Sequence, residues 1–229
     1  MKIKFYIVLG LAAVFGIGFA FNLHAYIRRL ADTQEIIRQA DISRNESIQS
    51  LRYIFSNEEI VAHINIPATN ISYAITQGAD NEFYLYHDLL KQPNGNGSIF
   101  LDYLNSPCFT DKSTIIYGHN REDGTMFHDL QLFQDYDFFQ ENRYIILNTM
   151  EGTLYYKIFA VFTAHISFNY IIVDFADSYA FLALVEEMKD RAMHQREVEI
   201  NADDRILILS TCTRLGLTGR LVLLGLKIS

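Results

Sequence analysis

Three residues whose side chains could together carry out acyl transfer each lie at the end of a strand-like segment. Cys212 ends the apolar run 205–211, Arg220 opens a second apolar run that reaches Ile228, and His119 follows the β-type run 113–117. A thiolate is a nucleophile, an imidazole moves protons, and a guanidinium can hold a developing oxyanion. Each residue alone has an ordinary structural explanation, but the three together indicate a site with a cysteine nucleophile.

The spacing of the histidines and cysteines argues against a metal site. The chain has seven histidines and two cysteines, without a His-x-x-x-His or Cys-x-x-Cys pair. Two cysteines are too few for a disulfide framework, although a single bridge between Cys108 and Cys212 stays open. We therefore expect no metal site, and acyl transfer by a cysteine nucleophile needs no organic cofactor.

The N-terminal segment 1–29 predicts a membrane anchor. Lys2 and Lys4 precede an uncharged run over residues 5–26, and Arg28 follows it. The run provides the roughly 20 residues that span a bilayer, and no small-x-small cleavage site of a signal peptide follows it. An uncleaved anchor is therefore favoured over a signal peptide and over a buried soluble helix.

The charge of the chain excludes nucleic acid as a partner. The net charge is −8, and beyond residue 29 there are 15 basic and 27 acidic residues, which gives −12. Binding to nucleic acid depends on clustered positive charge. The acidic balance therefore agrees with a soluble domain that binds no nucleic acid.

The remaining chain divides into a helical linker and a catalytic body. Residues 30–57 are predicted to be helical and to pack one face on the body, with a capping box at Ser43–Glu46; a mere spacer is the alternative for the first half. Residues 58–229 are rich in short β-type runs. These are 60–66, 71–75, 98–101, 113–117, 143–149, 153–165, 205–211 and 219–228.

Two helices interrupt these strands. Met126, Leu130 and Phe133 share one face of the first helix. The second helix has Asp177 or Ser178 as its N-cap and buries a face that comprises Phe181, Leu184, Val185, Met188 and Ala192. The pattern predicts a mainly β, α+β fold: an eight-stranded, closed or nearly closed barrel with a helix inserted late. A doubly wound α/β fold is disfavoured, because strands and helices do not alternate and no Gly-rich phosphate loop is present.

Several motifs resemble the sortases, which are membrane-anchored transpeptidases of Gram-positive bacteria. The segment Ile208-Leu-Ser-Thr-Cys212 resembles the Thr-Leu-x-Thr-Cys signature of that family. Segments 98–102 and Tyr117-Gly-His-Asn120, with 125–127 opening a helix, resemble the histidine region of class B sortases, and the late helix also fits that class. The resemblance covers about 58–229. Its one departure is Ile208 in place of threonine, on the same strand face as Cys212, which removes a hydroxyl but no catalytic group.

The resemblance implies a role for each site residue. Cys212 would attack a backbone carbonyl in a sorting-motif peptide of a secreted protein and form a thioester; His119 would protonate the leaving amine and then deprotonate the incoming one; Arg220 would stabilise the oxyanion. Ser210 and Thr211 would contact the substrate, although a structural hydroxyl is an equal alternative for each. The acceptor would be an amine of the peptidoglycan precursor, and the catalytic domain would be extracellular and anchored in the membrane.

Three other functions remain to be weighed. A pilus-assembling sortase would use the same three residues with a lysine of another subunit as the acceptor, and a cysteine peptidase would use water. Both stay open at the level of the sequence. A catalytically silent binding module is disfavoured, because Cys212, His119 and Arg220 are all present.

Overall fold

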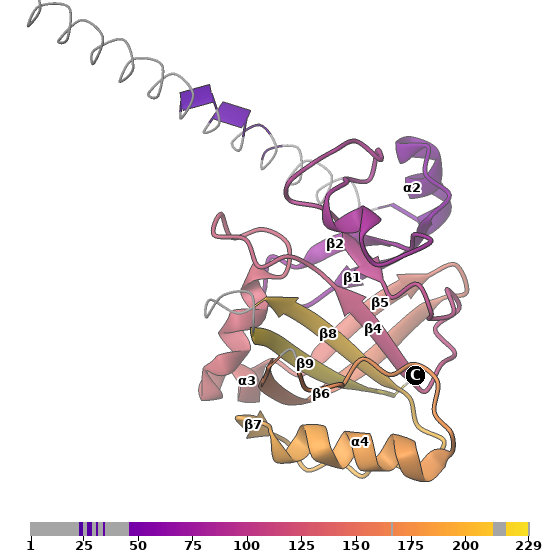
Figure 1. Cartoon of the computed structure of the whole chain (residues 1–229), viewed down its shortest axis with the longest axis vertical. Coiled ribbons are helices and arrows are strands. Elements are labelled where there is room, and N and C mark those ends of the chain that lie inside the picture. The colour runs from indigo at the N-terminus through magenta and orange to yellow at the C-terminus, as the bar shows by residue number, and fades with distance from the viewer. Residues whose placement is uncertain are drawn as a thin grey trace, which may run out of the picture.

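A closed barrel of eight strands forms the body of the protein (Figure 1). The computed structural model describes residues 46–165, 167–212 and 219–228 and six isolated residues between 23 and 34, with Cys212 described by its backbone alone. The elements, in chain order, are α2 (Ile48–Phe55), β1 (Ile60–Asn65), β2 (Ser72–Thr76), η1 (Phe83–Leu85), β3 (Ile99–Leu101), β4 (Ser113–Tyr117), η2 (His128–Gln134), α3 (Tyr136–Glu141), β5 (Tyr144–Thr149), β6 (Thr153–His165), α4 (Ser178–Asp190), β7 (His194–Gln195), β8 (Ile206–Cys212) and β9 (Gly219–Lys227).

The order of the strands around the barrel is β5-β1-β2-β3-β4-β8-β9-β6, and pairing of β5 with β6 closes the ring. The pairs β2–β3 and β4–β8 are parallel, and the other neighbours in the ring are antiparallel. All eight predicted strands are present, so the predicted barrel is confirmed. The two-residue strand β7, which pairs with β6, was not predicted, because two residues carry no periodic pattern.

The two faces of the barrel wall pack into two different apolar clusters. Leu207 and Leu209 of β8 lie in the larger cluster, which fills the barrel interior. Ile206 and Ile208 lie in the second cluster, which also contains Phe181 and Met188 of α4. Side chains alternate between the two faces of a strand. Every second residue of β8 from Ile206 onward, including Ile208 and Ser210, therefore faces the outside of the barrel.

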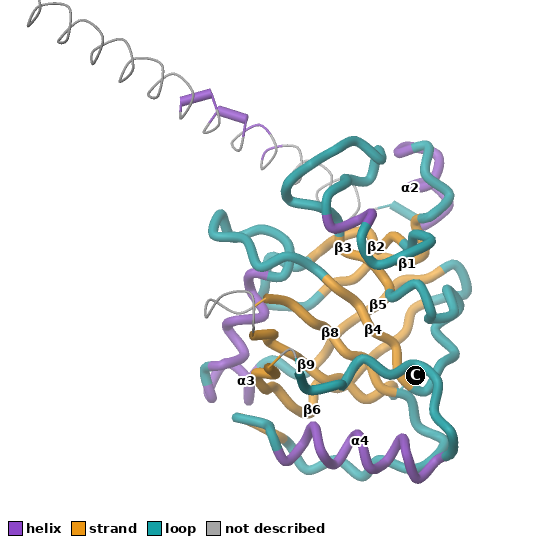
Figure 2. Tube along the Cα trace, in the orientation of Figure 1, coloured by secondary structure: helices purple, strands orange, loops and turns teal. Residues whose placement is uncertain are grey.

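Helix α4 covers this outer face and runs below the barrel in the view of Figure 2. Asp177 is its N-cap, and the Asp177 side chain accepts a hydrogen bond from the backbone N–H of Ala180 at 2.8 Å. Phe181, Leu184, Val185 and Met188 are its buried residues, which confirms the predicted apolar face. Ala192, predicted to share this face, lies beyond the end of the helix.

The first predicted helix starts later than expected. Met126 has a φ of 58°, which no helix accommodates, and η2 begins only at His128 as a 3-10 helix. Met126, Leu130 and Phe133 are nevertheless all buried in the barrel core. The pattern therefore identified the buried residues correctly, but it was wrong about the helix type and its first residue.

Helix α2 also begins later than the predicted capping box at Ser43–Glu46. Its N-cap is Ser47, whose backbone is extended and whose side chain accepts a hydrogen bond from Ser50 N at 3.1 Å. An extended residue at 47 interrupts the continuous helix that we predicted through this region, while residues 43–45 lie outside the described part. Helix α2 packs one face on the barrel, as predicted for residues 30–57, and this face consists of Ile48, Leu51 and Phe55.

The predicted membrane anchor falls almost wholly on residues outside the described part of the chain. Within the residues that the structure describes, none of the helices has the length and apolar character needed to cross a bilayer. The anchor therefore stays a prediction from the sequence.

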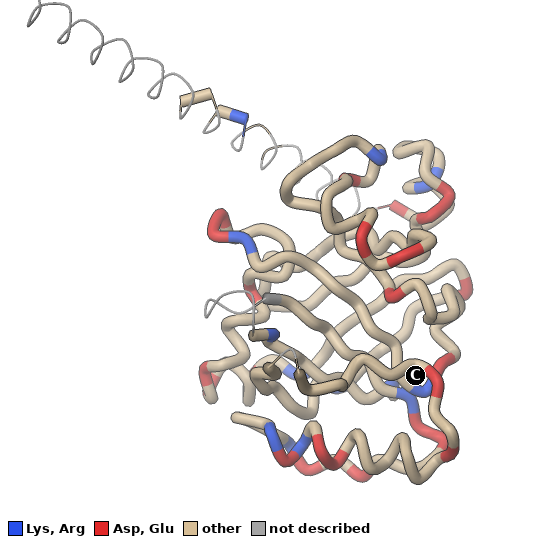
Figure 3. Tube along the Cα trace, viewed as in Figure 1, with Lys and Arg blue, Asp and Glu red and all other residues tan. Residues whose placement is uncertain are grey.

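Charged residues lie mainly in the helices and loops around the barrel (Figure 3). Within the described strands β4, β8 and β9, the charged residues are Arg220 and Lys227, at opposite ends of β9. Arg220 is therefore the charged residue at its end of these three strands.

Candidate active site

The ends of three neighbouring strands bring the predicted catalytic positions together. In the antiparallel pair β8–β9, Cys212 and Arg220 are direct cross-strand partners. In the parallel pair β4–β8, Tyr117 is the partner of Ser210, and His119 follows Tyr117 by two residues. Directly opposed residues have Cβ atoms about 5 Å apart, so the backbone register alone places Cys212 next to Arg220.

A pocket of about 280 Å³ opens at these strand ends. Four of the five predicted site residues line it: His119, Ser210, Thr211 and Arg220. The other lining residues are Asn81, Leu85, Phe100, Tyr117, Gly118 and Ile171. The side chain of Cys212, like residues 213–218, lies outside the description, so the fifth site residue is placed by its backbone only.

The imidazole of His119 is fixed by a backbone carbonyl. Its Nε2 atom lies 2.8 Å from the carbonyl oxygen of Leu85. A carbonyl oxygen only accepts hydrogen bonds, so Nε2 carries a proton and Nδ1 is the basic nitrogen of the neutral ring. Burial lowers the pKa of His119; the Leu85 carbonyl opposes this shift and the charge of Arg121 adds to it. The neutral imidazole therefore dominates at neutral pH, and the imidazolium is a minority species.

The lowered pKa of His119 predicts a specific loss of stability in acid. The unfolded imidazole titrates near its ordinary pKa of 6.5 and the folded one at lower pH, so the unfolded chain binds more protons between the two values. The free energy of unfolding should therefore fall as the pH falls below about 6.5, with no contribution at higher pH. Replacement of His119 by Gln should reduce this acid-side loss, measured by urea denaturation at several pH values. An equal loss of stability in the wild type and in His119→Gln would contradict the assignment.

Gly118, immediately before His119, packs closely against two neighbouring side chains. A Cβ atom at this position would lie 2.4 Å from Ile99 Cδ1 and 2.8 Å from the ring of Phe127. Both neighbours are buried, and the N–H of Phe127 donates a hydrogen bond to the carbonyl of His119 at 2.9 Å. Any shift that accommodates a larger residue at 118 therefore moves the support of His119.

We expect Gly118→Ala to destabilise the fold by about 1–3 kcal/mol, the usual cost of overpacking a core. Gly95→Ala is the matched control, because a Cβ atom there meets nothing within 4 Å. Thermal or urea unfolding of the two variants measures the difference. Equal stability of the two variants would show that the side chains of Ile99 and Phe127 can shift without lowering the free energy of unfolding.

A buried polar network holds Tyr117 beside Arg220. The carboxylate of Asp102 is 1% exposed and accepts hydrogen bonds from Tyr117 Oη at 2.7 Å and from Asn81 Nδ2 at 2.9 Å. Burial raises the pKa of Tyr117, and the charge and hydrogen bond of Asp102 raise it further, while the positive charge of Arg220 acts in the opposite direction. Tyr117 therefore stays protonated, and Arg220 lies close enough to influence it.

The neighbours of the cysteine face opposite sides of the barrel wall. Ser210 Oγ lies 2.8 Å from Tyr170 Oη, in the outer layer below the pocket. Thr211 follows the interior-facing Leu209 by two residues, and its buried Oγ1 has no hydrogen-bond partner among the described residues. The roles of both residues in substrate binding stay predictions.

The departure at Ile208 has a structural reason. Ile208 is fully buried in the outer cluster with Val222 and Leu224, on the same strand face as Ser210. An apolar side chain therefore suits this position. Asn120 lies in the loop after His119, where its Oδ1 accepts a hydrogen bond from Gln131 Nε2 at 2.8 Å; it supports the loop and does not line the pocket.

The pocket walls that come from other loops were not predicted from the sequence. Asn81 and Leu85 belong to the segment between β2 and β3, and Ile171 to the segment between β6 and α4. These segments carry no periodic pattern, so only the folded chain brings them to the strand ends. The polar network beside the pocket left one signal in the sequence. Asp102 directly follows the predicted strand 98–101, and Tyr117 lies two residues before His119.

Comparison with known proteins agrees with this arrangement. The family model described as "Sortase domain" matches residues 64–227. Sortase B of Listeria monocytogenes is 36% identical over 156 residues, which cover 68% of this chain and 63% of that protein; for sortase B of Staphylococcus aureus the values are 30%, 68% and 64%. The matched region thus spans less than two thirds of these two relatives. The crystal structure of sortase B from B. anthracis has a TM-score of 0.79 at 27% identity and covers 89% of this chain and 99% of that chain.

Proposed function

Because the chain belongs to the sortase family, and within it to class B, we propose that it is a cysteine transpeptidase. Its reaction would cleave a sorting motif near the C-terminus of a secreted protein and join the new acyl end to an amine of the peptidoglycan precursor. The observation that carries the proposal is the pairing of Cys212 with Arg220 at the mouth of the pocket that His119 also lines. This arrangement would bring a nucleophile, a permanent cation and a proton carrier together at the strand ends.

In the first half-reaction, the thiolate of Cys212, formed by transfer of the thiol proton to Nδ1 of His119, attacks the carbonyl carbon of the scissile peptide bond. The negative charge on the carbonyl oxygen is stabilised by Arg220, the charged residue at this end of β4, β8 and β9. The C–N bond then breaks, His119 gives a proton to the leaving amine, and a thioester on Cys212 remains.

In the second half-reaction, an incoming amine attacks the thioester carbonyl. His119 is now neutral, and its basic Nδ1 takes the proton from this amine. The tetrahedral intermediate again carries its charge beside Arg220, and its collapse releases the thiolate of Cys212. The lowered pKa of His119 makes it a ready proton donor once protonated, although it limits the fraction of chains in that form.

We propose further that residues 1–29 anchor the protein in the cell membrane with the catalytic domain, 58–229, outside the cell. The uncharged run over residues 5–26 between basic residues supports this arrangement. Residues 30–57 would link the two, and the burial of Ile48, Leu51 and Phe55 on the barrel supports this role for the second half of the linker. The enzyme would then bind both the peptide and the amine at the extracellular face of the cell membrane.

The test is an incubation of the full-length protein, in mild detergent, with a panel of sorting-motif peptides. Each peptide is offered with water alone, with amines that mimic the peptidoglycan precursor, or with a lysine-containing peptide. Mass spectrometry follows the thioester on Cys212 and the identity of the product. Joining to the precursor-like amine supports the proposal. Hydrolysis that no amine diverts indicates a peptidase, and joining only to lysine indicates a pilus-assembling enzyme.

A further inference from the structure

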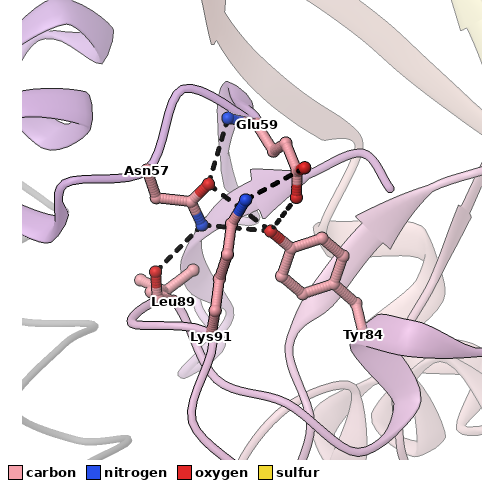
Figure 4. Close-up of polar contacts among 5 residues, drawn as sticks. All are labelled: Asn57, Glu59, Tyr84, Leu89 and Lys91. Atoms are coloured by element: carbon pink, nitrogen blue, oxygen red, sulfur yellow. Dashed lines mark hydrogen bonds and ion pairs between the residues drawn. The ribbon is translucent and has the colours of Figure 1, made fainter. Parts of the chain in front are cut away.

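A polar cluster next to the 3-10 helix η1 lies outside the pocket. It consists of Asn57, Glu59, Tyr84 and Lys91 (Figure 4). The ring of Tyr84 is completely buried, and its hydroxyl donates a hydrogen bond of 2.5 Å to Glu59 Oε2. Such a short bond to a carboxylate is typical of a charge-assisted interaction.

The other members of the cluster keep the carboxylate charged and in place. Lys91 Nζ lies 2.9 Å from Glu59 Oε1. The Asn57 side chain donates to Tyr84 Oη at 3.1 Å and to the carbonyl of Leu89 at 2.9 Å, and its Oδ1 accepts from Glu59 N at 3.0 Å. Burial raises the pKa of Glu59, but hydrogen bonds from Tyr84 and Lys91 and the charge of Lys91 bring it below its ordinary value. The Tyr84 hydroxyl therefore has an ionised acceptor at neutral pH.

This cluster connects to His119 through one backbone turn. Tyr84 and Leu85 are consecutive residues of η1, and the Leu85 carbonyl is the acceptor for His119 Nε2 at 2.8 Å. The Tyr84 carbonyl accepts a hydrogen bond from Ser98 N at 2.8 Å. On the same side, a Cβ atom on Gly97, whose φ is 62°, would lie 2.6 Å from both carbonyl oxygens. The turn is thus held by the Tyr84 side chain on one side and by the 97–98 backbone on the other.

We propose that Tyr84 and Glu59 are positioning residues for His119. Their hydrogen bond fixes the η1 turn, so that the Leu85 carbonyl holds the proton of His119 on Nε2 and leaves Nδ1 as the basic nitrogen. The inference rests on the proposed function for its catalytic consequence, but the tautomer of His119 is a property of the protein alone.

The removal of a single hydroxyl tests this connection. Tyr84→Phe keeps the buried ring and removes the hydroxyl, together with its hydrogen bond to Glu59 and the one that it accepts from Asn57, so the turn loses its polar anchor. Glu59→Leu removes the acceptor at similar size, while Glu59→Gln keeps an oxygen that accepts from Tyr84. Tyr156→Phe is the matched control, because Tyr156 is another buried tyrosine, in β6 within the barrel interior.

The direct readout is the two-bond ¹H–¹⁵N NMR spectrum of His119 in the full-length protein, which distinguishes the two tautomers of an imidazole. We expect the Nε2–H form in the wild type, in Glu59→Gln and in Tyr156→Phe. We expect a shift toward a mixture of both forms in Tyr84→Phe and in Glu59→Leu. An unchanged spectrum in these two variants, or an equal change in Tyr156→Phe, overturns the proposal.

Kinetics give the second readout once a peptide substrate is known. Tyr84→Phe and Glu59→Leu should lower kcat about tenfold with KM within about twofold, because a misplaced proton carrier slows chemistry without loosening the bound peptide. Glu59→Gln should restore kcat. If no peptide reacts with the wild-type protein, the proposed function fails while the NMR result still decides the positioning role. A rise in KM with kcat unchanged would contradict the role and assign the cluster to substrate binding.

Discussion

Replacement of Cys212 by alanine is expected to abolish the acyl-enzyme and to reduce turnover by about 10⁴-fold or more. The thioester requires the sulfur, and the pairing of position 212 with Arg220 offers the attacking atom an electrostatic partner. Mass spectrometry of the protein after incubation with a reactive peptide measures the adduct, and release of the leaving peptide measures turnover. The variant should fold normally, because a cysteine-to-alanine change at a strand end removes a single atom.

Cys108→Ala is the matched control for the nucleophile. Cys108 is the other cysteine of the chain, and it is exposed in the loop between β3 and β4. Its removal should leave the adduct and the turnover at wild-type levels. Cleavage that persists in Cys212→Ala, or an adduct that disappears in Cys108→Ala, would exclude the proposed mechanism.

The strands of the barrel could be predicted because each is long enough to show its burial pattern. The run 206–209 is apolar on both faces, since one face fills the barrel and the other packs on α4. Helix α4 was predicted from an N-cap at Asp177 or Ser178 together with its apolar face, and the structure has Asp177 as the N-cap. Local sequence and tertiary packing agree in these elements.

The helix boundaries were predicted less well, since they depend on single-residue geometry. Ser43 and Ser47 are equally good capping residues by type, and the structure uses Ser47. At Met126 a positive φ replaces the expected start of a helix, although the side chain still enters the core. An apolar pattern indicates which residues are buried, but it does not determine the backbone dihedral angles at those residues.

The candidate site shows the same division between local and long-range information. His119, Cys212 and Arg220 were found because each lies at the end of a recognisable strand. Asn81 and Leu85 were missed, because their place at the pocket depends on the parallel pairing of β2 with β3 and on the fold of the intervening loop. Such contacts depend on tertiary structure, and no local sequence pattern predicts them.

Replacement of Arg220 by alanine is expected to lower kcat by about 10²–10³-fold, the usual cost of losing a group that stabilises an oxyanion. Arg220→Lys should recover only part of this loss, because an ammonium is a point charge on a flexible stem, whereas a guanidinium donates several hydrogen bonds in a fixed plane. Steady-state kinetics with a reactive peptide measures both variants. Adduct formation on Cys212 should slow in parallel with kcat, since the charge acts on the first tetrahedral intermediate.

Arg191→Lys is the matched control: it makes the same arginine-to-lysine change at a position that does not line the pocket. Arg191 is the C-cap residue of α4, pairs with Glu187 at 2.8 Å and lies over the ring of Phe168. It should keep wild-type kcat, because an exposed ion pair contributes little and lysine can re-form it. If Arg220→Lys were as active as the wild type, a positive charge alone would suffice at the strand end. The oxyanion would then be held by charge, and its hydrogen bonds would have to come from backbone N–H groups near Cys212.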